Sequence, residues 1–191
     1  MPLYAVTGGI GSGKSHVCRM LEQAGYPVFR CDDEARRLMH TDIDLRLDLR
    51  RLVGNDIYDT DGRLRKAAMR DFLCRGREQA ARVNALVHPR VALALSAWVA
   101  AFGDNRKNLF MECALLYETG FEALCDHTIY IYCPHEERLR RVMARDGIDR
   151  SRAEQWIALQ MPEEEKQSRA DYVVVNDGKA DIAAQLRQIL P

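Results

Sequence analysis

A glycine-rich turn at residues 8–15 limits what this chain of 191 residues can fold into. Its sequence, Gly-Gly-Ile-Gly-Ser-Gly-Lys-Ser, has the spacing G-x-x-x-x-G-K-[ST]. The apolar run from Leu3 to Thr7 predicts a buried strand before the turn, and the pattern from Lys14 to Ala24 predicts a helix after it. In this context the glycines let successive N–H groups point at phosphate oxygens, and the helix contributes the positive end of its dipole. The sequence therefore predicts a phosphate-binding loop, and a glycine turn without a ligand is the alternative.

Strand patterns alternate with helical patterns along most of the chain. Further strands are expected at Tyr26 to Arg30, Asn108 to Cys113, His127 to Cys133 and Tyr172 to Asn176. Alternation of this kind implies an open parallel sheet covered by helices on both faces. We predict an α/β fold of the P-loop NTPase type, with three α/β/α layers and a central parallel five-stranded sheet.

The predicted nucleotide-binding core consists of residues 1–35 and 104–191. Residues 36–103 are mainly helical in pattern and are predicted to form an inserted substrate lobe, in which His88-Pro89 begins an apolar helix. Within the core, residues 141–169 are predicted to form a lid. The run from Glu163 to Glu165 is expected to interrupt the helices of that lid, which predicts a flap that moves.

The chain has 28 Lys and Arg residues against 28 Asp and Glu residues, so its formal net charge is zero. This balance argues against a protein that coats nucleic acid or an anionic membrane, because both need a large basic excess.

The longest uncharged apolar stretch, Val91 to Phe102, is shorter than the ~20 residues that cross a bilayer. No export leader is recognised, so the cytoplasm is expected, with six reduced cysteines serving as small core residues. No obligate protein partner is inferred.

The loop residues suit a nucleoside triphosphate. Lys14 can reach the β- and γ-phosphates, and the Ser15 hydroxyl can ligate Mg²⁺. GTPases, motor ATPases and kinases share such a loop. No Asn-Lys-x-Asp run is present to bind guanine, and the chain is short for a motor ATPase, so a small nucleotide-dependent kinase is predicted. The candidate nucleotide-binding residues in and after the loop are Gly9, Gly11, Ser12, Gly13, Lys14, Ser15 and His16.

Asp32 follows the second expected strand, so it emerges at the same edge of a parallel sheet as the phosphate loop. A carboxylate there can take a proton from an acceptor hydroxyl or hold Mg²⁺ through water, and a plain helix cap is the alternative.

Further along the chain, Arg138, Arg141 and Arg145 share one face of a helix. Arginines brought in by a closing flap stabilise the charge that develops during phosphoryl transfer, and a solvated basic face is the alternative.

Taken together, these residues resemble the dephospho-coenzyme A (dephospho-CoA) kinase family over essentially the whole chain. The resemblance begins with the extended loop Thr7 to Ser15 and continues through Val28 to Asp32. It is completed by shorter matches in the same order and spacing, namely Ala35-Arg36, Asp61-Gly62-x-Leu64, Lys66, Arg70, His88-Pro89, Leu115-Leu116-x-Glu118, Arg141, Arg145, Gln160, Ala170-Asp171 and Asn176-x-Gly178.

The resemblance implies transfer of the ATP γ-phosphate to the ribose 3′-hydroxyl of dephospho-CoA, which gives CoA in the last step of its biosynthesis. It implies a phosphate-loop core, a helical CoA-binding lobe and a lid, with Mg²⁺ accompanying ATP. Asp32 would be the general base and would act in catalysis with Lys14 and Arg141. The substrate would meet Asp32, Lys66 and His88, whereas Arg141, Arg145 and Asn176 would lie by ATP.

Four positions depart from the family pattern. His16 stands where threonine is usual, Arg30 where the family has the first aspartate of Asp-x-Asp, Ala114 where it has proline, and Arg138 where glutamine is common. Lys14, Ser15 and Asp32 are all present, so we expect an active enzyme. A nucleoside or nucleotide kinase of similar build, and a nucleotide-responsive binding protein without phosphotransfer, are the alternative functions.

Overall fold

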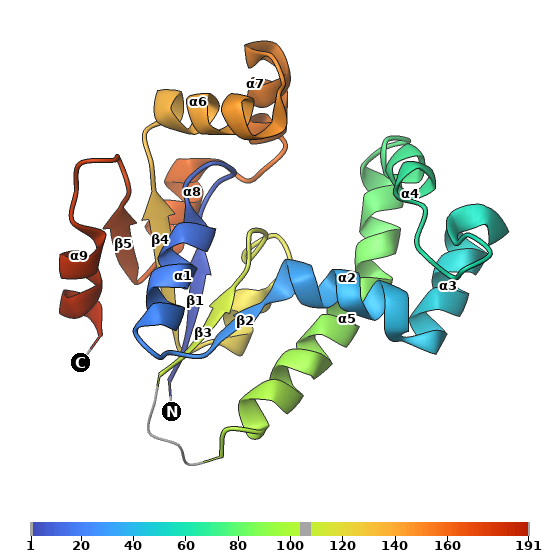
Figure 1. The fold of residues 1–191 in the computed structure, drawn as a ribbon, viewed down its shortest axis with the longest axis horizontal. Coiled ribbons are helices and arrows are strands. Elements are labelled where there is room, and N and C mark those ends of the chain that lie inside the picture. Colours follow the sequence, from blue (N-terminus) through green and yellow to red (C-terminus); the bar gives the residue numbers. More distant parts are fainter. Residues whose placement is uncertain (1, 104–107, 191) are drawn as a thin grey trace. The chain divides into compact units, whose positions relative to one another are not determined.

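The computed structural model of this chain describes residues 2–103 and 108–190. It divides into two compact units (Figure 1). One unit, which we call the α/β unit, comprises residues 1–30 and 104–191, and the other, the helical unit, comprises residues 31–103.

Five parallel strands form the sheet of the α/β unit. They are β1 (Leu3–Thr7), β2 (Val28–Arg30), β3 (Leu109–Glu112), β4 (His127–Tyr132) and β5 (Tyr172–Val175), in the spatial order β2-β3-β1-β4-β5. All five residues of the central strand β1 are buried, which explains why its sequence is a continuous apolar run and not an alternating one. The predicted five-stranded parallel sheet is confirmed.

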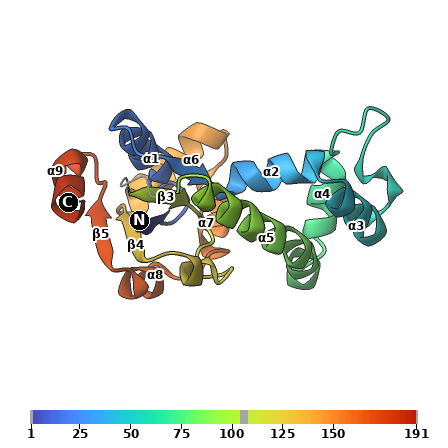
Figure 2. The same ribbon diagram turned by 90° about the horizontal axis from the view of Figure 1, so that it is seen from below.

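Helices cover both faces of this sheet, and Figure 2 shows α1 and α8 on opposite sides of it. On one face, α1 (Lys14–Gln23) and α9 (Ile182–Ile189) pack on the strands. On the other face, α8 (Glu163–Arg169) contacts β4. The three predicted α/β/α layers are therefore present. The core of the first face contains Tyr4, Val6, Val17, Cys18, Leu21, Phe110, Ile129, Ile131, Val174, Ile182 and Leu186.

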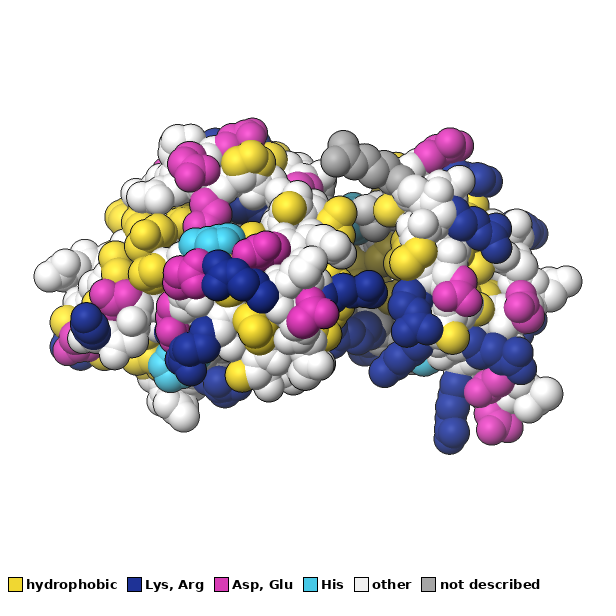
Figure 3. Space-filling model, turned by 90° about the horizontal axis from the view of Figure 1, so that it is seen from above, with side chains coloured by type: hydrophobic (Ala, Val, Ile, Leu, Met, Phe, Trp, Pro, Cys, Tyr) yellow, Lys and Arg dark blue, Asp and Glu magenta, His cyan; other side chains and the backbone are white. Residues whose placement is uncertain are grey.

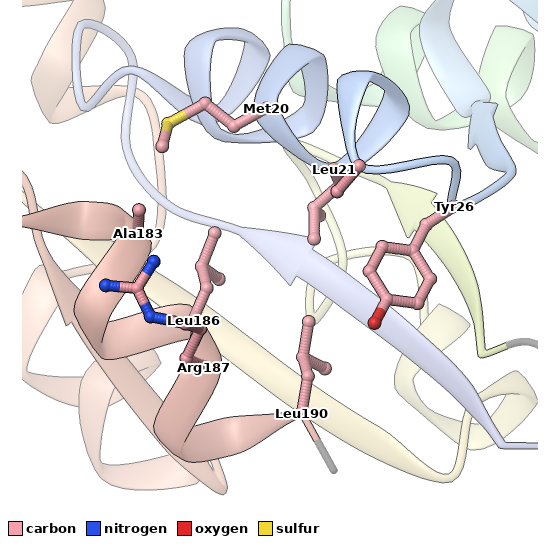
Figure 4. A pocket seen from close by; sticks show the side chains of 8 residues that line it. Met20, Leu21, Tyr26, Ala183, Leu186, Arg187 and Leu190 are labelled. Carbon is pink, nitrogen blue, oxygen red and sulfur yellow. The ribbon is translucent and has the colours of Figure 1, made fainter.

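Between α1 and α9 the structure leaves an apolar pocket of about 210 Å³ (Figure 4). Its walls include Met20 and Leu21 from α1, Leu186 and Arg187 from α9, and Tyr26 from the turn before β2. The residues that α1 contributes lie in its C-terminal half, whereas the phosphate loop joins its N-terminal end. The pocket is thus a separate feature from the loop.

Two further helices of the α/β unit, α6 (His135–Asp146) and α7 (Arg150–Ala158), share a small apolar cluster of their own. Ile10 of the phosphate loop packs against this cluster. The expectation that the glutamate run breaks the helical pattern is wrong, because Glu163, Glu164 and Glu165 form the first turn of α8. Three carboxylates at the positive end of a helix stabilise it, and Pro162 just before them suits a helix start.

The helical unit consists of α2 (Cys31–Thr41), α3 (Ile43–Val53), the 3₁₀ turn η1 (Asn55–Ile57), α4 (Lys66–Leu73) and α5 (Arg77–Ala100). Helix α5 is its centre, since α2, α3 and α4 each contact it. Basic side chains are frequent on the surface of this unit (Figure 3). Its buried apolar residues are Cys31, Leu38, Leu45, Leu49, Ile57, Tyr58, Met69, Phe72, Val83, Val87, Val91 and Leu95.

The prediction that His88-Pro89 begins a helix is wrong, because Pro89 lies inside the 24-residue helix α5. Proline removes a backbone N–H and crowds the carbonyl four residues earlier, so a helix continues through it only with other support. Burial provides that support, since Val87 and Val91 are both in the core. In addition, Arg90 Nη1 donates to the carbonyl of Leu86 at 2.8 Å.

By length and composition alone, α5 would also suffice to cross a membrane over Glu78–Ala100, where the mean hydropathy is 1.3. Core helices of globular proteins meet the same criteria, so this is weak evidence. The helix carries Arg90, which pairs with Asp48 at 2.8 Å and with Asp42 at 3.6 Å, and an ion pair of this kind is typical of a packed helical lobe.

All six cysteines are free thiols, as predicted. Four of them are buried, Cys125 is half-buried, and Cys74 is exposed just after α4, so Cys74 departs from the expected core placement. Burial raises the pKa of the Cys18 thiol to about 12 and that of Cys125 to about 11. These two thiols are therefore poor nucleophiles at neutral pH.

Candidate active site

The phosphate loop connects β1 to α1 and needs glycine at two of its turns. Gly11 has φ of 80°, and a Cβ there would lie 2.8 Å from the carbonyl oxygen of Arg138. Gly13, the residue before α1, has φ of 93°, and a Cβ there would overlap the side-chain amide of Asn176. Both positions combine a left-handed backbone with a close neighbour, so the tight wrap of the loop depends on the missing side chains.

Lys14 closes the loop on itself. Its Nζ donates to the carbonyl of Gly8 at 2.8 Å and to that of Gly9 at 3.2 Å. The first N–H groups of α1 have no acceptor within the helix, as at any helix N-terminus. The loop therefore places an ammonium group at the positive end of a helix, which is an arrangement that binds phosphate.

A carboxylate that the sequence analysis did not single out lies beside the loop serine. Ser15 Oγ donates to Glu112 Oε1 at 2.8 Å, and Arg30 Nη1 donates to Glu112 Oε2 at 2.6 Å. Glu112 is the last residue of β3, which pairs with both β1 and β2. The signal in the sequence is a lone acidic residue at the end of an apolar strand, at the sheet edge that carries the loop.

The serine and the glutamate fit a magnesium ion. Mg²⁺ prefers oxygen ligands and takes only one or two from the protein, the rest coming from water and phosphates. A hydroxyl and a carboxylate 2.8 Å apart at the N-terminus of α1 supply such oxygens next to the place for phosphates. In the described part of the chain no cluster of three His, Cys, Asp or Glu side chains could hold a metal ion.

On the opposite side of the loop, Arg141 and Asn176 meet at the carbonyl of Ser12. Asn176 Nδ2 donates to this oxygen at 2.7 Å, and Arg141 Nη1 donates to it at 3.4 Å. Arg141 also reaches the carbonyl of Asn176 at 3.2 Å and pairs with Glu137 at 2.8 Å. Hydrogen bonds from Arg140 and Arg141 lower the pKa of the Glu137 carboxyl to about 2, so Glu137 is ionised and fixes the guanidinium of Arg141.

Comparison with known proteins decides the family. A family model described as dephospho-CoA kinase matches residues 3–181. This chain belongs to the dephospho-CoA kinase family. A dephospho-CoA kinase of Bacteroides fragilis is 36% identical over 185 residues, which cover 97% of this chain and 89% of that protein. The chain is thus a member of an enzyme family, and neither alternative function is favoured.

Solved structures agree with membership of the dephospho-CoA kinase family. A crystal structure of a Thermus thermophilus protein has a TM-score of 0.85 and 34% identity, covering 98% of this chain and 95% of that one. Dephospho-CoA kinase from Campylobacter jejuni has a TM-score of 0.70 at 21% identity, covering 97% of this chain and 92% of that one. At that identity the second comparison supports the fold alone.

The predicted site residues of this dephospho-CoA kinase family member fall into two groups. Around the loop, the structure brings together Lys14, Ser15, Arg141 and Asn176. It does not bring Arg145 to them, since that guanidinium pairs with the neighbouring carboxylate of Asp146 at 2.6 Å. His16 is exposed on α1. The ATP-binding roles of Arg145 and His16 stay predictions.

The residues expected to meet the substrate of a dephospho-CoA kinase lie in the helical unit. Asp32 is exposed in the first turn of α2, where its neighbours Asp33 and Glu34 pair with arginines. Within residues 2–103 and 108–190 the Asp32 carboxylate forms no hydrogen bond or ion pair. Lys66 is exposed at the start of α4, and His88 is half-buried in α5. Burial lowers the pKa of His88, so its imidazole is neutral at pH 7.

Proposed function

We propose that this chain transfers the γ-phosphate of ATP to the ribose 3′-hydroxyl of dephospho-CoA and so forms CoA. Membership of the family supports the reaction. The observation that supports it in the structure is the phosphate loop, whose lysine, serine and Glu112 lie together at one sheet edge.

The loop would hold the triphosphate through its backbone amides and Lys14. Phosphoryl transfer places developing negative charge on the oxygens of the transferred group, so fixed positive groups accelerate it. Lys14 is held at the loop by two carbonyls, and Arg141 is held by Glu137 and by the carbonyl of Ser12. Neither cation needs to reorganise far to face a phosphate, and preorganised charge of this kind is what lowers a barrier.

Magnesium would be held by the Ser15 hydroxyl, with Glu112 beside it. When bound, the ion supplies Lewis-acid neutralisation of the β- and γ-phosphate oxygens. Arg30 orients the Glu112 carboxylate through its 2.6 Å contact. Glu112 thereby offers a carboxylate next to Ser15, although Arg30 occupies the position of the first aspartate of the family's Asp-x-Asp segment.

Asp32 would act as general base toward the 3′-hydroxyl. Its carboxylate is exposed and has no arginine partner in the described residues, unlike those of Asp33 and Glu34. An unpaired carboxylate can accept a hydrogen bond from a hydroxyl group, orient it for in-line attack and take its proton as the new P–O bond forms. The helical unit, residues 36–103 in particular, would bind the CoA part of the substrate through groups such as Lys66 and His88, and residues 141–169 would serve as the lid.

An acceptor panel tests the proposal. Purified protein with Mg²⁺ and ATP is expected to form ADP and CoA from dephospho-CoA, measured by chromatography of both products. Adenosine, AMP and deoxynucleosides serve as competing acceptors, and phosphorylation of one of these instead of dephospho-CoA would contradict the proposed substrate. We expect cytoplasmic enzyme activity that needs no nucleic acid, membrane or protein partner.

A further inference from the structure

Both backbone polar groups of Ile10, at the tip of the phosphate loop, are bound by side chains from outside the loop. The N–H of Ile10 donates to Gln160 Oε1 at 2.7 Å. The carbonyl of Ile10 accepts from Arg138 Nε at 2.9 Å. Gln160 follows α7, and Arg138 belongs to α6. The loop is therefore held by two anchors, one from α6 and one from the segment after α7, that are more than a hundred residues away in sequence.

The segment that carries Gln160 is itself fixed to the body of the α/β unit by Glu118. Glu118 Oε1 accepts from the N–H of Met161 at 3.0 Å and pairs with Lys166 Nζ at 2.8 Å. Lys166 is 1% exposed, so this ion pair has little competition from water. Burial raises the pKa of Glu118, but the hydrogen bonds from Lys166 and Met161 outweigh that effect and leave the pKa below its usual range.

Arg138 ties the same segment to the loop a second time. Its side chain is 1% exposed and packs directly against Gly9, where any Cβ would collide with the guanidinium. It also pairs with Glu163 in the first turn of α8. Residues 160–166 thus contact the loop through Gln160 and through the Glu163 pair with Arg138.

These contacts restrict the orientation of the peptide groups in the loop. A loop that binds phosphate needs its other N–H groups turned toward the ligand. When the N–H and the carbonyl of Ile10 are held by side chains, the neighbouring peptide groups can rotate less. If the anchor is lost, only part of the population holds the binding conformation, and the apparent dissociation constant rises by the inverse of that fraction.

We propose that Gln160 is a positioning residue of the ATP site, acting through the Ile10 amide and held in place by Glu118. The inference rests on the proposed function only in taking ATP as the ligand.

The test measures ATP binding directly in the full-length protein. Titration calorimetry with Mg²⁺ and a non-hydrolysable ATP analogue compares the wild type with Gln160→Leu, which keeps the size of the side chain and removes the acceptor. We expect the dissociation constant to rise about tenfold, the KM for ATP to rise with it, and kcat at saturating ATP to stay within about twofold. The matched control is Gln188→Leu, the same substitution at an exposed position of α9, and it should bind as the wild type does.

A second variant tests whether ATP binding depends on the hydrogen bond itself or only on a polar side chain at position 160. Gln160→Asn keeps the amide but is one methylene too short to hold the 2.7 Å contact, so it should behave like Gln160→Leu. Hydrogen exchange should show a protected Ile10 amide in the wild type and faster exchange in both variants, with melting temperatures nearly unchanged. An unaltered affinity for the analogue in Gln160→Leu, wild-type binding by Gln160→Asn, or an equal loss in Gln188→Leu would overturn the inference.

The experiment also distinguishes this inference from the proposed function. Binding of the analogue is measured without any acceptor, so it reports on Gln160 whether or not CoA is formed. A wild type that binds the analogue and yields no CoA would contradict the proposed function alone. A wild type that forms CoA, with Gln160 variants that bind the analogue normally, would contradict the positioning role alone.

Discussion

Replacing Gly13 by alanine should both destabilise the α/β unit and impair ATP binding. The new Cβ would enter the space of the Asn176 amide, in a backbone with φ of 93°. A left-handed conformation costs a non-glycine residue about 1–2 kcal/mol. Displacing Asn176 breaks the 2.7 Å bond from its side-chain amide to the Ser12 carbonyl, and a buried N–H donor left unpaired costs about 1–3 kcal/mol more.

Together these effects amount to about 2–5 kcal/mol of unfolding free energy, which for a chain of this size lowers the melting temperature by roughly 5–15 °C. Differential scanning calorimetry measures this change. The matched control is Gly178→Ala, because Gly178 has φ of 84° and nothing within 4 Å of a built Cβ. In this control only the unfavourable left-handed backbone conformation lowers the unfolding free energy, so the melting temperature should fall by only a few degrees.

A double variant isolates the overlap. Adding Asn176→Ala to Gly13→Ala removes the amide that the Cβ would strike, so the two substitutions together should cost less than the sum of their separate costs. Strict additivity, or equal losses in Gly13→Ala and Gly178→Ala, would refute the argument that contact with Asn176 is what makes glycine necessary in this turn.

Three further predictions concern the remaining groups of the site. Asp32→Asn should keep ATP binding and lose on the order of 10²–10⁴ in turnover, measured by coupled ADP release, and full activity would exclude Asp32 as the base. Glu112→Gln should raise the Mg²⁺ concentration for half-maximal rate about tenfold, or 1.4 kcal/mol, whereas Glu22→Gln, which also removes a partner of Arg30, should not. Burial lowers the pKa of His88 below its ordinary 6.5, so the unfolded chain binds a proton more readily as pH falls. Stability should therefore decline below about pH 6.5, and this decline should be smaller in His88→Asn when melting temperatures are compared at pH 7.5 and 5.5.

The sheet and the loop could be predicted because their residues obey local rules. The run Leu3 to Thr7 is buried throughout and reads as a parallel strand, and the glycines after it meet backbone demands that no other residue meets. Lys14 and Ser15 follow from the same spacing. Their contacts lie within a few residues or at the adjacent strand, so the sequence carries the information.

Other features depend on partners that are distant in sequence. The proline of α5 looks like a helix start, yet the buried stripe Val83, Val87, Val91 and Leu95 continues through it and decides the outcome. Glu112 is held in its position beside Ser15 by a hydrogen bond from Arg30. In the sequence, Arg30 was noted only as a departure from the family pattern. Contacts between side chains of neighbouring strands, such as the one between Arg30 and Glu112, are visible only once the strand order is known.

The uneven exposure of the six thiols makes the protein suitable for labelling in its natural sequence. With a pKa of about 12, the Cys18 thiol is ionised to the extent of only about one part in 10⁵ at pH 7, and the other buried cysteines are shielded from reagents. A maleimide dye should therefore attach at Cys74, next to α4 in the helical unit. Its emission would then report how this unit responds to dephospho-CoA in real time, without a cysteine-free background having to be built first.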